Sequence, residues 1–263
     1  MKLVITMVAG AAVLLAPLPA QAGAATAESG VKNPVAALKA QLKTGRGVRF
    51  TDASAFVGSI NNDPLVRRTG VVRFGKKGIV ASDVRGTFAS PLFDGHTTKP
   101  ERTIIIGKDA WRSGGVLAES LPKGKTWYKT FSLFNTGTVS SWFGQLVSPL
   151  EPATLAELVK RGKRSGSTYR GTIGLERLYN ISPWFGQTLG MIRATDATIT
   201  YTLTVDRKGL PSRLKTTWLA KDLANLPTWE EKTIETETRY TGWGTKVSIK
   251  PPPRSQVTSK LED

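Results

Sequence analysis

Polar and apolar residues alternate most regularly in residues 198–205, which read TITYTLTV. The isoleucine, tyrosine, leucine and valine of this segment fall on one side, and its four threonines fall on the other. A period of two residues is typical of a strand with one buried face. Residues 206–209 (DRKG) then predict a turn, and 211–220 predict the returning strand, one side of which carries Leu214, Thr216 and Trp218.

Shorter alternating runs predict further strands. Residues 75–78 (GKKG) separate two apolar runs, as do residues 107–109 (GKD) farther along the chain, and each is expected to turn a hairpin. Residues 126–131 predict another short strand. Residues 230–240 also alternate but are more polar, which favours a strand at a sheet edge or with one solvated face.

Two segments predict helices that begin with a proline. In the first, Asn33 is a favourable N-cap, Pro34 suits the first helical position, and Gly45 is expected to stop the helix. Its apolar side would carry Val35, Leu38 and Leu42.

The second helix is expected in residues 152–162. Its apolar residues lie at helical spacing, and Lys160 and Arg161 fall in the last turn, where the helix dipole favours cations. Gly162 is expected to end it. The apolar stripe of this helix consists of Leu155, Leu158 and Val159.

Hairpins on both sides of a helical middle predict an α+β protein and not a series of βαβ units. We expect a curved antiparallel sheet with a few helices across its concave face. Residues 251–263 contain three consecutive prolines, cannot be helical there and are expected to fray.

The first 22 residues predict a secretory signal peptide. Lys2 is followed by an apolar stretch at residues 3–15 and by the small-x-small site Ala20-Gln21-Ala22. No later stretch approaches the roughly 18 apolar residues that a spanning helix needs. We therefore expect an exported protein with a single domain at residues 23–250.

Charge narrows the choice of partners. The formal net charge is +17, from 37 basic and 20 acidic residues. Such a surface attracts polyanions, and for an exported bacterial protein these are anionic membranes and wall polymers. No nucleic-acid-binding motif occurs, so nucleic acid is not an expected partner. The chain contains no cysteine, which excludes disulfides and a lipidated cysteine anchor.

Recognisable catalytic motifs are missing. The one histidine, His96, lies in a segment with the composition of a surface loop, and no G-x-S-x-G elbow accompanies it. Asp94 and His96 are too few for a metal site. The GKT at residues 124–126 resembles the end of a phosphate loop, but Glu119 stands where that motif needs glycine. We expect no enzyme, no metal and no cofactor.

The tetrapeptide Trp-Phe-Gly-Gln occurs twice, at residues 142–145 and 184–187. Neither copy lies in an alternating run, which favours loops or short helices that lay aromatic side chains against the sheet. These aromatics are either core residues or mobile lips of a ligand cavity, and chance similarity is a third alternative. The candidate ligand-binding residues are Trp142, Phe143, Leu146, Trp184, Phe185 and Leu189.

Four short motifs in residues 121–253 resemble, in order, those of the LppX/LprG-type bacterial lipoproteins, relatives of the LolA/LolB lipoprotein carriers. They are LPKGKTWYK, SPLEPATLAELVKRGKRSGSTYRGT, YTLTVDRKGLPSRL and YTGWGTKVSIKPPP. The resemblance implies an open half-barrel sheet with helices across its concave side and an apolar cavity for acyl chains, without catalysis or cofactor. One departure is that Gly23 follows Ala22 where the family carries a lipidated cysteine.

These observations predict a protein that binds a lipid or another apolar ligand, as a carrier or sensor of the bacterial cell envelope. The alternative is a basic wall- or envelope-associated module with a packed core and no ligand cavity. We expect a monomer that is extracellular or associated with the wall, without a lipid anchor. Its partners would be a lipid or acylated molecule and an anionic membrane or wall polymer.

Export can be tested by intact mass. We expect the secreted protein to begin at Gly23 and to carry no added mass, because the Ala20–Ala22 motif favours cleavage there and no cysteine is present to be acylated. Mass spectrometry of the protein recovered from its host measures this directly. A secreted species that retains Lys2, or that carries the mass of an acyl chain, would contradict the prediction.

Overall fold

The computed structural model describes residues 32–58, 63–88, 99–131, 138–189, 197–219 and 232–262. The predicted signal peptide at residues 1–22, Asp94 and His96 lie outside the described residues. All of the described residues belong to the unit formed by residues 31–263. No helix in this part of the chain is long and apolar enough to cross a membrane.

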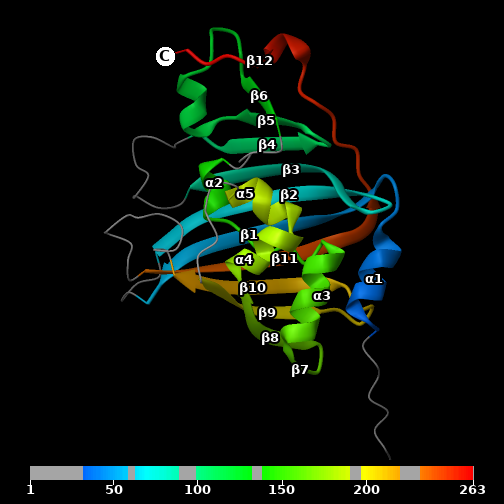
Figure 1. Cartoon of the computed structure of the whole chain (residues 1–263). Coiled ribbons are helices and arrows are strands. Elements are labelled where there is room, and N and C mark those ends of the chain that lie inside the picture. Colours follow the sequence, from blue (N-terminus) through cyan, green and yellow to red (C-terminus); the bar gives the residue numbers. More distant parts are fainter. Residues whose placement is uncertain are drawn as a thin grey trace, which may run out of the picture. The chain divides into compact units, whose positions relative to one another are not determined.

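The described strands form one twelve-stranded sheet in the order β12-β6-β5-β4-β3-β2-β1-β11-β10-β9-β8-β7 (Figure 1). Every pair of neighbours is antiparallel except β12 and β6, which are parallel. The strands are β1 (Arg46–Val57), β2 (Asp63–Gly75), β3 (Gly78–Phe88), β4 (Glu101–Ile106), β5 (Asp109–Ser113), β6 (Trp127–Phe131), β7 (Lys163–Ser165), β8 (Thr168–Gly174), β9 (Thr198–Val205), β10 (Pro211–Leu219), β11 (Thr233–Lys246) and β12 (Val257–Thr258).

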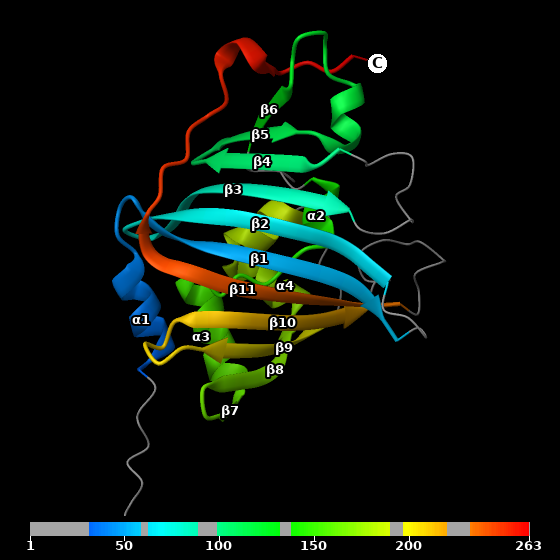
Figure 2. The ribbon, with the colours of Figure 1, turned by 180° about the vertical axis from the view of Figure 1, so that it is seen from behind.

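The sheet is open and curved, and the helices of the chain's middle lie across one of its faces. Figure 1 shows α2 to α5 in front of the sheet, and Figure 2 shows the sheet covering them from behind. This arrangement confirms the predicted α+β class. The helices are α1 (Pro34–Gln41), α2 (Val139–Trp142), α3 (Pro152–Arg161), α4 (Leu175–Ile181) and α5 (Pro183–Leu189), with short 3-10 turns η2 (Gly115–Glu119) and η5 (Arg254–Gln256).

The main core lies between the concave face and these helices. Strand β9 contributes its four apolar side chains to this core, as its alternation predicts, and all four are buried. Leu214, Thr216 and Trp218 of β10 are buried on the same side. The hydroxyl of Tyr201 donates to the backbone oxygen of Leu158 at 2.6 Å, which ties α3 to the sheet.

Both predicted hairpins are confirmed. Lys76 and Lys77 form the turn between β2 and β3, where Gly75 pairs with Gly78. Gly107 and Lys108 form the turn between β4 and β5. The expected short strand at residues 126–131 is β6.

The predicted helix starts are also confirmed. The Asn33 side chain accepts hydrogen bonds from the backbone nitrogens of Val35 (3.0 Å) and Ala36 (3.2 Å). Helix α3 begins at Pro152, and the Gly162 nitrogen donates to the Leu158 oxygen at its end. Gly45 does not stop α1, which ends at Gln41. Gly45 instead has a φ of 78° in the turn that enters β1, a backbone conformation that favours glycine.

Strand β11 lies between β1 and β10, so of the two alternatives for residues 230–240 one solvated face is confirmed and an edge position is excluded. The prediction for the C-terminal tail is wrong. The C-terminal tail does not fray: Val257 and Thr258 pair with β6 as β12. Val247 and Ile249 are buried in a second, smaller apolar cluster with Ala81, Ile104, Trp111 and Trp127. Buried apolar contacts and a strand partner hold the tail despite its prolines.

Candidate binding cavity

A cavity of about 510 Å³ lies between the sheet and the helices. Strands β3 and β4 form one wall, and the first turn of α3 with α4 and α5 forms the other. Cavities of roughly 300–1,000 Å³ are typical of small-molecule sites. The lining residues are Lys77, Gly78, Ile79, Val80, Ala81, Ser82, Ile105, Gly107, Glu151, Pro152, Ala153, Ile181, Pro183, Trp184 and Gln187.

The lining is mainly apolar. Isoleucine, valine, proline, alanine and tryptophan side chains contribute most of it. The polar exceptions are Ser82, Glu151 and Gln187, together with Lys77, which is exposed in the β2–β3 turn. Such a surface can hold a hydrocarbon group but offers few partners to a strongly polar molecule.

Trp184 is held in the helical wall by three contacts. Its indole Nε1 donates to the backbone oxygen of Gln145 at 2.9 Å, and its backbone nitrogen donates to Glu151 Oε1 at 2.8 Å. Its ring lies edge-on to Phe50 of β1, with centroids 6.0 Å apart and planes at 84°. These contacts fix a large aromatic ring at the cavity.

Glu151 connects α3 to α5 from inside the wall. Its side chain accepts hydrogen bonds from the hydroxyls of Thr154 (3.1 Å) and Ser182 (2.5 Å) as well as from the Trp184 nitrogen. Only 7% of the residue is exposed. Burial raises the pKa of the Glu151 carboxyl, and the three hydrogen bonds oppose that rise in part.

The two Trp-Phe-Gly-Gln copies contact each other, since Trp184 of the second copy donates to Gln145 of the first. Phe143 and Phe185 are both buried, with 4% and 2% exposed. The tryptophans differ: Trp142 ends α2 and is 39% exposed, whereas Trp184 is half-buried. The phenylalanines are thus core residues, and the second tryptophan alone reaches the cavity.

Gln145 is the polar centre of the first copy. Its Nε2 donates to Thr238 Oγ1 at 3.1 Å, and its Oε1 accepts from Thr216 Oγ1 and from the Val147 nitrogen, both at 3.1 Å. It therefore fastens the segment that follows α2 to β10 and β11. Its counterpart Gln187 has a different position, because it lines the cavity.

A buried ion pair lies beneath the first copy. Arg68 of β2 donates through Nε to Asp52 Oδ1 at 3.0 Å and through Nη2 to Oδ2 at 2.6 Å, and the two side chains are 2% and 1% exposed. The Gln145 nitrogen donates to Asp52 Oδ2 at 3.4 Å. Gly144 lies against the guanidinium so closely that a Cβ there would be 1.9 Å from Arg68 Cζ.

Of the six residues proposed from the sequence, Trp184 lines the cavity. Phe143, Leu146 and Phe185 are buried in the core and do not line the cavity, and Trp142 is exposed and does not line it either. Leu189 ends α5, and its side chain lies outside the described part of the chain. Whether any of the six binds a ligand stays a prediction.

The sequence did not identify the sheet side of the cavity. Ile79, Ser82 and Ile105 belong to ordinary strand patterns, and nothing local distinguishes them from core positions. The repeat was the one signal that led to the site, through Trp184. Within the described residues, no group of three histidine, aspartate or glutamate side chains is placed to hold a metal ion.

The close approach at Gly144 predicts different effects of the same change in the two copies. Gly144→Ala should lower the free energy of unfolding by about 2–4 kcal/mol, because the methyl group would displace the buried guanidinium. Gly186→Ala meets no atom within 4 Å and lies inside α5, so it should raise stability by up to about 1 kcal/mol. Urea denaturation measures the stability of both variants. Equal effects of the two changes would contradict the different surroundings of Gly144 and Gly186.

The raised pKa of Glu151 predicts a pH-dependent contribution to stability. The folded state holds this proton more tightly than the unfolded state, so the contribution is complete below the ordinary carboxyl pKa and is lost as the pH rises through the raised value. Glu151→Gln removes the titration. Relative to the wild type, the variant should therefore gain stability between about pH 4 and about pH 7. Urea titrations at both pH values measure the difference, and a constant difference would refute the prediction.

No family model matches the chain, and no curated protein matches it. Among solved structures, it is similar to LprF from Mycobacterium bovis with a TM-score of 0.41 and 12% identity, over 83% of this chain and 96% of that one. A LolA superfamily protein from Nitrosomonas europaea is similar with a TM-score of 0.34 and 9% identity, over 82% of this chain and 93% of that one. A DUF1329 family protein from Desulfovibrio piger is similar with a TM-score of 0.34 and 11% identity, over 84% of this chain and 95% of that one. Similarities of this degree carry no inference about function, and the family resemblance of the sequence motifs stays a prediction.

Proposed function

We infer that the protein binds a lipid or another apolar ligand in the cavity between β3–β4 and α3–α5. The observation that supports this most directly is the cavity itself, with about 510 Å³ of space and a mainly apolar lining. Apolar surface that is left unfilled by side chains favours an apolar guest. The alternative, a basic module with a packed core, does not account for this space.

An acyl chain suits the cavity on energetic grounds. Each buried methylene contributes about 0.8 kcal/mol, so a short enclosed length of chain already provides useful affinity. The ring of Trp184 and the side chains of Ile79 and Ile105 supply apolar contact from opposite walls. Hydrogen bonds of Trp184 to Gln145 and Glu151 hold this wall in place without a ligand, which lowers the ordering cost of binding.

We further infer that the protein acts outside the cytoplasm as a carrier or sensor in the bacterial cell envelope, without a lipid anchor. The predicted signal peptide at residues 1–22 and the lack of cysteine in the sequence support this. The net charge of +17 supports an additional attraction to anionic membranes or wall polymers.

Filling the cavity should weaken ligand binding. Ile105→Trp places a larger ring in the space, and Ala153→Trp does so from the exposed first turn of α3, where folding is least disturbed. Each should weaken binding of a fluorescent fatty acid by about tenfold or more, which corresponds to at least 1.4 kcal/mol. Fluorescence titration measures the affinity, and urea denaturation confirms that each variant is folded.

Leu219→Trp is the matched control. Leu219 is an exposed apolar residue at the end of β10 and does not line the cavity, so its replacement should leave binding unchanged. Organic extraction of protein from its host, followed by mass spectrometry, should recover the natural ligand. Wild-type protein that neither binds the fatty acid nor yields a lipid would favour the basic-module alternative.

A further inference from the structure

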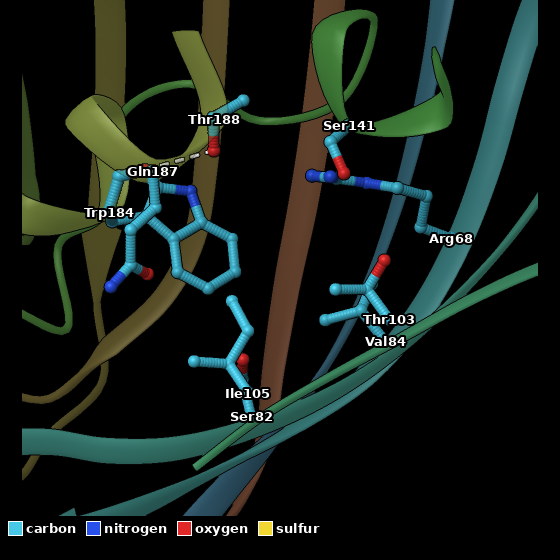
Figure 3. A pocket seen from close by; sticks show the side chains of 9 residues that line it. All are labelled: Arg68, Ser82, Val84, Thr103, Ile105, Ser141, Trp184, Gln187 and Thr188. Atoms are coloured by element: carbon cyan, nitrogen blue, oxygen red, sulfur yellow. Dashed lines mark hydrogen bonds between the residues drawn. The ribbon is translucent and has the colours of Figure 1, made fainter. Parts of the chain in front are cut away.

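A smaller chamber of about 30 Å³ adjoins the cavity (Figure 3). Ser82, Ile105, Trp184 and Gln187 line both spaces, so the two spaces meet at these side chains. Six of the nine residues that line the chamber have polar side chains, a larger share than in the cavity. Its remaining lining residues are Arg68, Val84, Thr103, Ser141 and Thr188.

Thr103 of β4 lines this chamber and carries an unsatisfied polar atom. The residue is 7% exposed, and its Oγ1 is buried without a hydrogen-bond partner in the described part of the chain. Figure 3 shows its side chain directed into the chamber. A buried hydroxyl that lacks a partner is destabilising, and such groups in folded proteins are usually satisfied by water or a ligand. Thr103 therefore points to a guest with a hydrogen-bonding group.

The other polar groups define what this guest must offer. Ser82 and Ser141 add two hydroxyls, and Arg68 brings its guanidinium to the same space. The charge of Arg68 is already balanced by Asp52, which accepts from Nε and Nη2. The lining contains no carboxylate, and its hydroxyls can donate as well as accept, so the chamber can receive an acceptor oxygen, whether charged or neutral.

We propose that this chamber receives the carboxyl or ester oxygen of an acyl ligand whose hydrocarbon chain lies in the larger cavity. The inference rests on the proposed function and adds the orientation of the ligand, with the polar end at Thr103. Trp184 and Gln187 then flank the point where the polar end joins the chain. The volume of the chamber admits a group of a few atoms and excludes a bulky head group.

Thr103→Val tests this orientation, because it replaces the hydroxyl with a methyl group of similar size. Lauric acid, methyl laurate and dodecane would each compete with a fluorescent apolar dye bound to the full-length mature protein. The wild type should bind the acid or the ester about fivefold or more tightly than the hydrocarbon. The variant should lose that preference and bind dodecane as the wild type does. The comparison of acid with ester shows whether a charged oxygen is required.

Thr236→Val is the matched control. Thr236 also carries a buried hydroxyl that has no partner among the described residues, is 0% exposed, and lines neither the cavity nor the chamber. Both variants should unfold at equal or higher urea concentrations than the wild type, since each removes an unsatisfied polar group. Only Thr103→Val should change the ligand preference.

Three outcomes would overturn the proposal. If each of the three ligands displaces the dye from Thr103→Val as it does from the wild type, the chamber holds water only, while the proposed function stands. If Lys77→Ala weakens the binding of lauric acid and Thr103→Val does not, the polar end of the ligand lies at the cavity's rim. If none of the three ligands displaces the dye from the wild type, the proposed function fails together with the inference.

Discussion

The ion pair between Asp52 and Arg68 is the constraint around which the concave side is built. Two charges this deeply buried are tolerated only as a hydrogen-bonded pair, and removing one partner typically costs about 3–5 kcal/mol. The two residues stand directly opposite each other on β1 and β2. A slip of one residue in this pairing would place the two charges on opposite faces of the sheet. The pair therefore fixes the register at the sheet's centre.

The segment after α2 takes its path from the same pair. Gly144 lies against the guanidinium, and Gln145 donates to Asp52 while its side chain reaches β10 and β11. The backbone oxygen of Gln145 in turn accepts a hydrogen bond from the indole Nε1 of Trp184. A polar network thus runs from the buried charges to the cavity wall. Short helices such as α4 and α5 gain little stability from their own backbone bonds, so contacts of this kind decide where they lie.

Much of the fold could be predicted from local patterns. The alternation in β9 and β10, the glycine-containing hairpin turns and the caps at Asn33 and Gly162 all depend on neighbouring residues. The order of the strands does not. Strand β11 is polar because one face is solvated, and its central place follows from pairing with β1, which is nearly two hundred residues away in sequence. Local polarity carries no information about such a partner.

The site was less predictable for the same reason. The repeated tetrapeptide led to Trp184 but also to Phe143 and Phe185, which are core residues. Identical residues have different environments because α2 ends over the ion pair, whereas α5 borders the cavity. Ile105 and Ser82 line the cavity because the curved sheet brings β3 and β4 opposite the helices, and local sequence does not reveal that curvature. The unsatisfied hydroxyl of Thr103 could be recognised only once its surroundings were known.

The two edges of the sheet are protected in different ways, and this affects how the protein tolerates change. At one edge, β7 is three residues long and carries exposed Lys163 and Arg164, a short and charged edge that discourages pairing with other chains. At the other edge, the C-terminal tail lies beside β6 as β12 (Figure 1). Residues 257–258 therefore cover the edge of β6, which disfavours pairing of that edge with another chain. A truncation before residue 257 would expose the backbone hydrogen-bonding groups of β6 and turn that edge into a template for aggregation.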